Sequence, residues 1–159
     1  MDYRISHYNE LNKKTQWTSV SDIIDENNLE ETFSLYKRTE DKYINIFKKL
    51  LKENDIIKMG IYALERHRNK GIYKTILDKA LLKRLKLKNG NTYLLEDTLE
   101  ILKFCLREVI WCKFEWENIY IHIGYDYYAY IGGLEITRKC IEEEFRKGIT
   151  IEEFKSPYL

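Results

Sequence analysis

The residues best suited to chemistry are concentrated in one short stretch. His122 and Asp126 lie close together in the sequence, and several tyrosines flank them. A histidine near a carboxylate and a phenol can transfer protons, as in a nuclease. A hairpin rich in the same residue types also occurs as a structural sheet edge or as a binding surface. We prefer this non-catalytic interpretation to a nuclease site.

No other group of residues has a spacing typical of catalysis or metal binding. The three histidines are far apart, and the three cysteines, Cys105, Cys112 and Cys140, include no pair with the spacing of zinc ligands. Gly132-Gly133 lacks the flanking elements of a phosphate-binding loop, and there is no Gly-x-Ser-x-Gly elbow. We therefore expect no catalytic residues, no metal and no cofactor, and we expect the chain not to be an enzyme.

Charge is balanced overall but uneven along the chain. The net charge of +1 gives no general argument for a nucleic acid or a membrane as partner. Residues 21–31 contain five acidic residues and no Lys or Arg, whereas residues 66–88 contain nine Lys or Arg and one acid, Asp78. Such runs are most often solvated faces. The basic segment, with Tyr73, nevertheless offers an alternative function, a small nucleic-acid-binding module.

Composition indicates one folded domain in a reducing compartment. A chain of 159 residues is the size of a single domain, and 44% hydrophobic residues are enough for a core. The odd number of cysteines favours a reducing environment. The first ten residues have no apolar signal core, and no apolar run approaches the ~18 residues of a membrane span. We expect a cytoplasmic protein with no membrane partner.

Hydrophobic periodicity predicts the elements before the tyrosine-rich stretch. Residues 3–8 alternate like an edge strand, and Asn28 with Glu31 resembles a capping pair that opens a helix to about Glu53. Residues 56–65 are predicted as a strand with Ile57, Met59, Ile61 and Ala63 on one face. A helix is expected around residues 76–81, and residues 89–91 as a turn. The clearest helix covers residues 95–110, with a stripe formed by Leu95, Leu99, Leu102, Leu106 and Ile110.

The period then changes from that of a helix to that of a strand. Residues 112–116, 119–123 and 127–131 are predicted as an antiparallel β-meander at about residues 112–131, with turns at 117–118 and 124–126. Gly132-Gly133 ends the meander. A helix with Leu134, Arg138, Ile141 and Phe145 is expected to end at Gly148, before a strand at 149–154. The predicted fold is α+β, a single domain in which the meander packs with several helices.

The two faces of the predicted meander differ in composition. Ile119, Ile121 and Ile123 share one face, which we expect to pack on the helix at 95–110. Tyr120 and His122 share the other face, and Tyr128 and Tyr130 join them if the turn keeps register. This aromatic face is either covered by another helix or offered to a partner.

Several segments resemble a known family. They are Leu106-Arg-Glu-Val-Ile-Trp-Cys-Lys-Phe-Glu, Ile119-Tyr-Ile-His-Ile-Gly-Tyr-Asp-Tyr-Tyr-Ala-Tyr-Ile-Gly-Gly, Trp17-Thr-Ser-Val-Ser-Asp-Ile-Ile, the stretch 36–43 with Glu40 and Asp41, and Ile151-Glu-Glu-Phe-Lys-Ser-Pro-Tyr. In this order they resemble immunity proteins of bacterial contact-dependent growth inhibition and related polymorphic toxin systems. The resemblance spans most of the chain. It departs at Ala129, where the family more often has Met.

This resemblance implies a cytoplasmic inhibitor that binds and neutralises one cognate toxin C-terminal domain. Many such toxins are nucleases, and we favour an RNase. Tyrosines are common interface anchors, and acidic side chains would be attracted to a basic nuclease cleft. We expect the toxin-binding residues to be Glu115, Glu117, Tyr120, Tyr125, Asp126, Tyr128 and Tyr130. For Tyr125 and Asp126, the alternative is a buried corner required by the fold.

Overall fold

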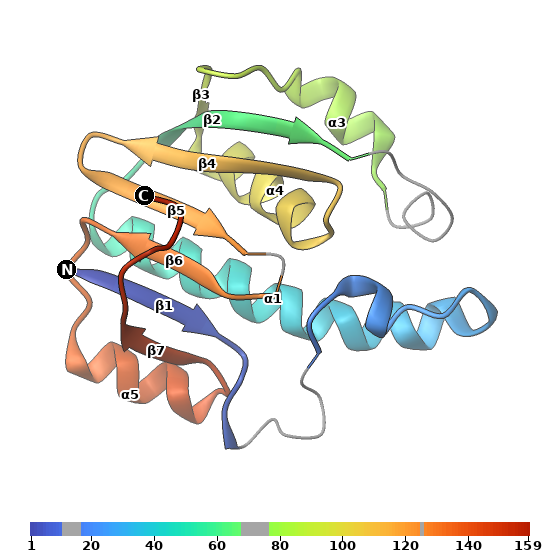
Figure 1. The fold of residues 1–159 in the computed structure, drawn as a ribbon, viewed down its shortest axis with the longest axis horizontal. Helices are drawn as coiled ribbons and strands as arrows, with labels where there is room; N and C mark the ends of the chain where they lie inside the picture. Colours follow the sequence, from blue (N-terminus) through green and yellow to red (C-terminus); the bar gives the residue numbers. More distant parts are fainter. Residues whose placement is uncertain (11–16, 68–76, 125) are drawn as a thin grey trace.

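The computed structural model describes residues 1–10, 17–67, 77–124 and 126–159. These residues form one seven-stranded sheet in the order β3-β2-β4-β5-β6-β1-β7 (Figure 1). Every neighbouring pair of strands is antiparallel. Helices pack with this sheet, so the predicted α+β class is confirmed.

The bounds of the elements agree with most of the predicted ranges. The strands are β1 (Asp2–Ser6), β2 (Lys58–Arg66), β3 (Thr92–Leu94), β4 (Ile110–Trp116), β5 (Ile119–Ile123), β6 (Ala129–Gly132) and β7 (Thr150–Glu153). The helices are α1 (Leu29–Glu53), α3 (Lys79–Leu85), α4 (Leu95–Leu106) and α5 (Arg138–Arg146), with short 3-10 helices η2 (Val20–Asp22) and η3 (Glu26–Asn28) before α1.

The predicted meander is confirmed as strands β4, β5 and β6. Register pairs Phe114 with Ile121 and Ile121 with Ile131 across the three strands. The turn between β4 and β5 consists of Glu117 and Asn118, and Glu117 has a positive φ of 56°. A positive φ at the first turn residue matches the right-handed twist of the strands, which allows so short a connection.

One face of the sheet forms the hydrophobic core. We call it the back face. The side chains of Phe114, Ile121 and Ile131 on this face are completely buried. Figure 1 shows α4 behind β2 and β4 and α1 passing behind the middle of the sheet. The isoleucine face of β5 therefore belongs to a core that includes α1 as well as the expected helix, with Tyr43, Phe47 and Leu50 contributed by α1.

The sequence pattern predicted an edge strand at the start of the chain, and this prediction is wrong. β1 lies between β6 and β7, and it pairs with both. The alternation of residue types along β1 arises because its side chains point in turn to the back face of the sheet and to the opposite face. The true edges are β3, which was not predicted, and β7, which joins the sheet from the far end of the sequence.

Two predicted apolar faces are broken by residues with positive φ. The helix at 95–110 ends at Leu106, because Glu108 has a φ of 55° and reverses the chain, and Ile110 begins β4. Ala63, with a φ of 51°, lies where the register between β2 and β4 shifts, so its side chain is exposed. Ile57 precedes β2 and is 68% exposed. Of the four residues predicted to share a face, Met59 and Ile61 are buried.

The helix starts differ in part from the predicted caps. Asn28 is the N-cap of α1, but its amide donates to Glu31 Oε2 at 3.2 Å and makes no capping bond to the backbone. A reciprocal capping box occurs instead at Ser19 and Asp22 of η2. The last helix begins at Arg138 and not at Leu134, because the Thr137 side chain caps it by accepting from Cys140 N at 3.2 Å.

Candidate functional site

The second face of the sheet, which we call the front face, carries two rows of polar and aromatic residues. One row runs Lys113, His122, Tyr130, Arg4 and Glu152 across five strands. The parallel row contains Glu115, Tyr120, Gly132 and Asp2. Successive side chains of a strand point to opposite faces, so these residues oppose the buried isoleucines.

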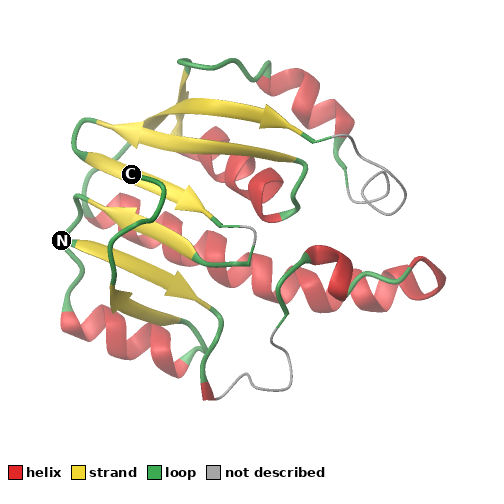
Figure 2. Cartoon of the chain, viewed as in Figure 1, coloured by secondary structure: helices red, strands yellow, loops and turns green. Residues whose placement is uncertain are grey.

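A loop segment, and not a helix, lies on the front face. We call residues 154–159 the strap, and Figure 2 shows it as a loop crossing in front of the strands. The hydroxyl of Ser156 lies 2.8 Å from His122 Nδ1, and the ammonium of Lys113 donates to the carbonyl of Tyr158. The ring of Tyr158 packs edge-on against His122 and Tyr130, with centroids 6.0 and 5.8 Å away. The aromatic face was expected either to be covered by a helix or to be open to a partner. It is instead covered in part by a loop (Figure 2).

His122 is the most buried polar residue of this face. Its side chain is 1% exposed, and it stacks on Tyr120 with ring centroids 4.7 Å apart. Burial, reinforced by the positive charge of Lys113, lowers the pKa of His122 to about 4. Its Nε2 is buried and has no hydrogen-bond partner among the described residues. The imidazole is therefore neutral at pH 7 and has one unused ring nitrogen.

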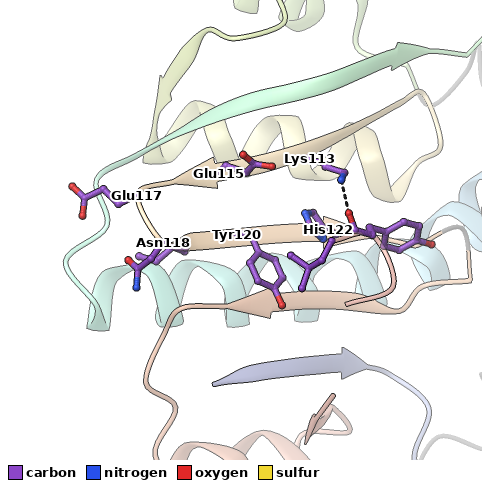
Figure 3. Close-up of a pocket in the computed structure, with 9 residues that line it drawn as sticks. Lys113, Glu115, Glu117, Asn118, Tyr120 and His122 are labelled. Carbon is purple, nitrogen blue, oxygen red and sulfur yellow. Dashed lines mark hydrogen bonds between the residues drawn. The ribbon is translucent and has the colours of Figure 1, made fainter. Parts of the chain in front are cut away.

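Tyr120 owes its position to a glycine on the next strand. Gly132 faces Tyr120 across β5 and β6, and a Cβ at Gly132 would overlap the tyrosine ring. An aromatic ring that covers a cross-strand glycine is a common device in sheets. Figure 3 shows the phenol pointing from β5 across β6. Burial and the nearby carboxylate of Asp2 raise the pKa of Tyr120 to about 12.

These residues line an open cavity of about 300 Å³ at the turn between β4 and β5. Figure 3 shows Lys113 and Glu115 reaching it from β4, and Tyr120 and His122 from β5. The full lining is Lys113, Glu115, Glu117, Asn118, Ile119, Tyr120, His122, Tyr158 and Leu159. Glu115 and Glu117 are exposed, and neither forms an ion pair with any residue that the structure describes.

The predicted toxin-binding residues fall into separate groups. Glu115, Glu117 and Tyr120 meet at the cavity. Asp126 and Tyr128 follow β5 and therefore lie at its opposite end, roughly 17 Å away for a strand of five residues.

Tyr128 and Tyr130 take up mainly structural positions. The half-buried ring of Tyr128 lies 4.6 Å from the guanidinium of Arg4. Tyr130 is only 6% exposed beneath Phe154 and Tyr158 of the strap. Tyr125 lies outside the described residues.

His122 and Asp126 do not form an acid–base pair in this fold. Nδ1 of His122 faces Ser156, whereas the carboxylate of Asp126 accepts from the backbone N–H of Tyr128 at 3.3 Å. Asp126 thus accepts a hydrogen bond within its own turn, and its side chain is exposed, so it is not the buried corner of the alternative. In the described part of the chain, no group of three or more His, Cys, Asp or Glu residues is placed to hold a metal ion.

The basic segment is only partly described. Tyr73, Ile76 and the rest of residues 68–76 lie outside the described residues. In the remainder, Arg84 pairs with Asp97 at 2.8 Å, and Arg66 donates to the carbonyl of Leu87 at 2.7 Å. Both arginines therefore make contacts within the fold, while Lys79 and Lys83 of α3 are exposed.

Sequence reasoning missed the contribution of the strap. Ser156 and Tyr158 touch residues more than 30 positions earlier in the chain, and no local pattern encodes such a contact. The only signal is that Ser156 and Tyr158 flank Pro157, which cannot continue a paired strand. Lys113 was missed because alternation within β4 alone does not distinguish an exposed lysine from a site residue.

The buried histidines predict a pH-dependent stability. Burial also lowers the pKa of His7 to about 4, with Lys42 adding to the effect. An unfolded chain binds these protons at a pKa of about 6.5. Between these values the unfolded state holds more protons, so the free energy of unfolding falls as pH falls.

We expect urea titrations to show full stability above pH 6.5 and a progressive loss toward pH 4. His122→Gln should lose less than wild type over this interval, whatever its stability at pH 7. An identical pH dependence in the two proteins would contradict the assignment of a neutral buried His122.

Comparison of the chain with models of known protein families, with curated proteins and with solved structures gives no match in any of the three. Among the residues that the structure describes, no helix has the length and apolar character required to cross a bilayer. The fold and the site define an α+β protein whose sheet has one helix-covered face and one face bearing a mixed-charge, aromatic cavity.

Proposed function

We propose that this chain is an immunity protein, which binds and neutralises a cognate bacterial toxin domain of a contact-dependent inhibition or related system. The toxin domain is a nuclease in this proposal, with an RNase favoured. The observation that carries the proposal is the front face. It presents aromatic rings and unpaired carboxylates around an open cavity, while the back face is committed to the core. The resemblance of most of the chain to such inhibitors supports the same function.

A second acidic region fits a basic partner as well. Asp22, Asp25, Glu26, Glu30 and Glu31 are all exposed. Figure 1 shows the start of α1, with the two 3-10 helices, projecting beyond the sheet. Local acidic patches of this kind accelerate association with a positively charged cleft, even when net charge is close to zero.

The proposal predicts protection of cells from one toxin. Immunity genes of the resembled family lie beside their toxin genes, so the toxin domain encoded next to this chain is the one to express. We expect growth to be restored when both proteins are present, and a stable complex on gel filtration. Absence of both rescue and complex would contradict the proposal.

Charge reversal on the front face tests where the toxin binds. Glu115→Lys with Glu117→Lys should slow association at least ~tenfold, because steering toward a basic surface becomes repulsion. Glu153→Lys is the control, since Glu153 is also exposed but lies in the edge strand β7, four strands away from β4. Equal association rates in the two variants would place the interface elsewhere, for example at the acidic residues before and within the first turn of α1.

The alternative of nucleic-acid binding predicts a different result. A module using residues 66–88 would bind RNA or DNA with an affinity that falls steeply with salt. A titration at two salt concentrations distinguishes it from the immunity proposal.

A further inference from the structure

The cavity between β4 and β5 has an unusual balance of charge. Its lining contains one lysine, Lys113, and two glutamates, Glu115 and Glu117. The lysine already donates to the carbonyl of Tyr158 in the strap. The carboxylates have no ion-pair partner among the described residues. The charge that is free to act on a ligand is therefore negative.

One residue of the lining has a buried polar atom without a partner among the described residues. His122 is 1% exposed and lines the cavity, yet its Nε2 has no partner within the described chain. Buried polar atoms are nearly always hydrogen-bonded, so an exception needs an explanation. Ser156 can accept a hydrogen bond from Nδ1–H, and Nε2 is then an acceptor that lacks a donor among the described residues.

Aromatic rings complete the lining. Tyr120 stacks on His122 at an interplanar angle of 20°, so the two rings pack face to face and one face of Tyr120 is covered. Tyr158 stands nearly perpendicular to His122, at 83°. A cation placed over a tyrosine ring is attracted by the negative face of the ring.

We propose that this cavity binds an arginine side chain of the partner protein, with the guanidinium between the carboxylate of Glu115 and the rings of Tyr120 and Tyr158. A planar guanidinium stacks on aromatic rings and has five N–H donors. It can therefore bind the carboxylate of Glu115 and stack on a tyrosine ring at once, whereas a compact lysine ammonium does not stack. The proposal relies on the proposed function for the identity of the partner, but the cavity can be tested without the toxin.

The direct test is an NMR titration of the full chain with blocked arginine, N-acetyl-arginine amide. Blocked citrulline is the control ligand, because it has the same shape without the charge. We expect saturable shifts at residues 113–123, and binding of arginine roughly tenfold tighter than citrulline, as one cation–π contact and one ion pair imply. No saturable shifts with arginine, or equal affinity for citrulline, would overturn the proposal.

Three variants identify the groups responsible. Glu115→Gln should weaken arginine binding about three- to fivefold, as expected for an exposed ion pair. Lys113→Met should strengthen it, because the one cation of the lining is removed. Glu153→Gln should leave it unchanged. Stronger binding in Glu115→Gln and weaker binding in Lys113→Met, together with binding of acetate or phosphate, would show an anion site and reject the arginine assignment.

The outcomes also separate this inference from the proposed function. Arginine binding without toxin protection would leave the cavity assignment in place and reject immunity. Toxin protection that is insensitive to Glu115→Gln, together with no arginine binding, would leave immunity in place and reject the cavity as its arginine site.

Discussion

Glu40→Ala should cost about 3–5 kcal/mol of the free energy of unfolding, because it removes the fully buried carboxylate that Lys37 and the largely buried Arg107 bind. The carboxylate of Glu40 is fully buried and receives two hydrogen bonds from Arg107, at 2.7 and 2.9 Å. A third comes from Lys37, at 2.8 Å. Burial alone would raise the pKa of Glu40, but Arg107 and Lys37 hold it below its ordinary value. The pair thus connects α1 to the end of α4 as a fully ionised bridge.

Urea unfolding measures this cost, and the neighbouring residue gives the control. Asp41 also pairs with Lys37, at 3.0 Å, but it is 56% exposed. Asp41→Ala should change stability by at most about 0.5 kcal/mol. The double change Glu40→Leu with Arg107→Met should recover most of the loss, since an apolar pair of similar volume often replaces a buried ion pair without cost. An effect of Glu40→Ala as small as that of Asp41→Ala would show that the pair is not buried as described.

Gly133→Ala should be the second severe change, with an expected cost of about 2–4 kcal/mol. Gly133 has a φ of 76°, which L-residues with a Cβ rarely adopt. An added Cβ would overlap the carbonyl oxygen of Asn118 and lie 2.8 Å from its carbon and 3.0 Å from Ile119 Cα. These are backbone atoms of the turn between β4 and β5, so they cannot move aside as a side chain would.

Gly90 separates the two causes of this effect. It has a similar φ of 81°, but a Cβ at this position would meet nothing within 4 Å. Gly90→Ala should therefore cost only the conformational part, about 1 kcal/mol. Thermal or urea unfolding of both variants gives the steric part by difference. Equal costs at the two positions would mean that the turn at Asn118 yields to the new side chain.

The meander was predictable because its pattern is local. A strand with one buried face alternates strictly, and Ile119–Ile123 has the same bounds in the sequence pattern and in the structure. The long helix α1 was predictable for a similar reason, since Tyr43, Ile46, Phe47 and Leu50 recur at helical spacing and are all buried. In the strand the burial pattern repeats every second residue, and in the helix it repeats with each turn, so each pattern can be recognised within one element.

The order of the strands was decided by tertiary structure. β1 and β7 are separated by more than 140 residues, yet they pair over four positions, and β1 thereby becomes an interior strand. An isolated strand pattern does not encode its neighbour, because edge and interior strands can alternate alike. Ile110 is a similar case, since a turn with positive φ at Glu108 moved it from the predicted helix into β4.

Some features of the candidate site follow from the local sequence pattern, and others depend on the tertiary structure. The sequence by itself determined that Glu115, Glu117 and Tyr120 share one end of a meander, because alternation and a two-residue turn fix their faces. Only the tertiary structure decided that His122 is buried and neutral, since the strap that covers it comes from residues 154–159. The physical reason is that a pKa and a cavity depend on all the atoms around a group, and most of those atoms belong to segments distant in sequence.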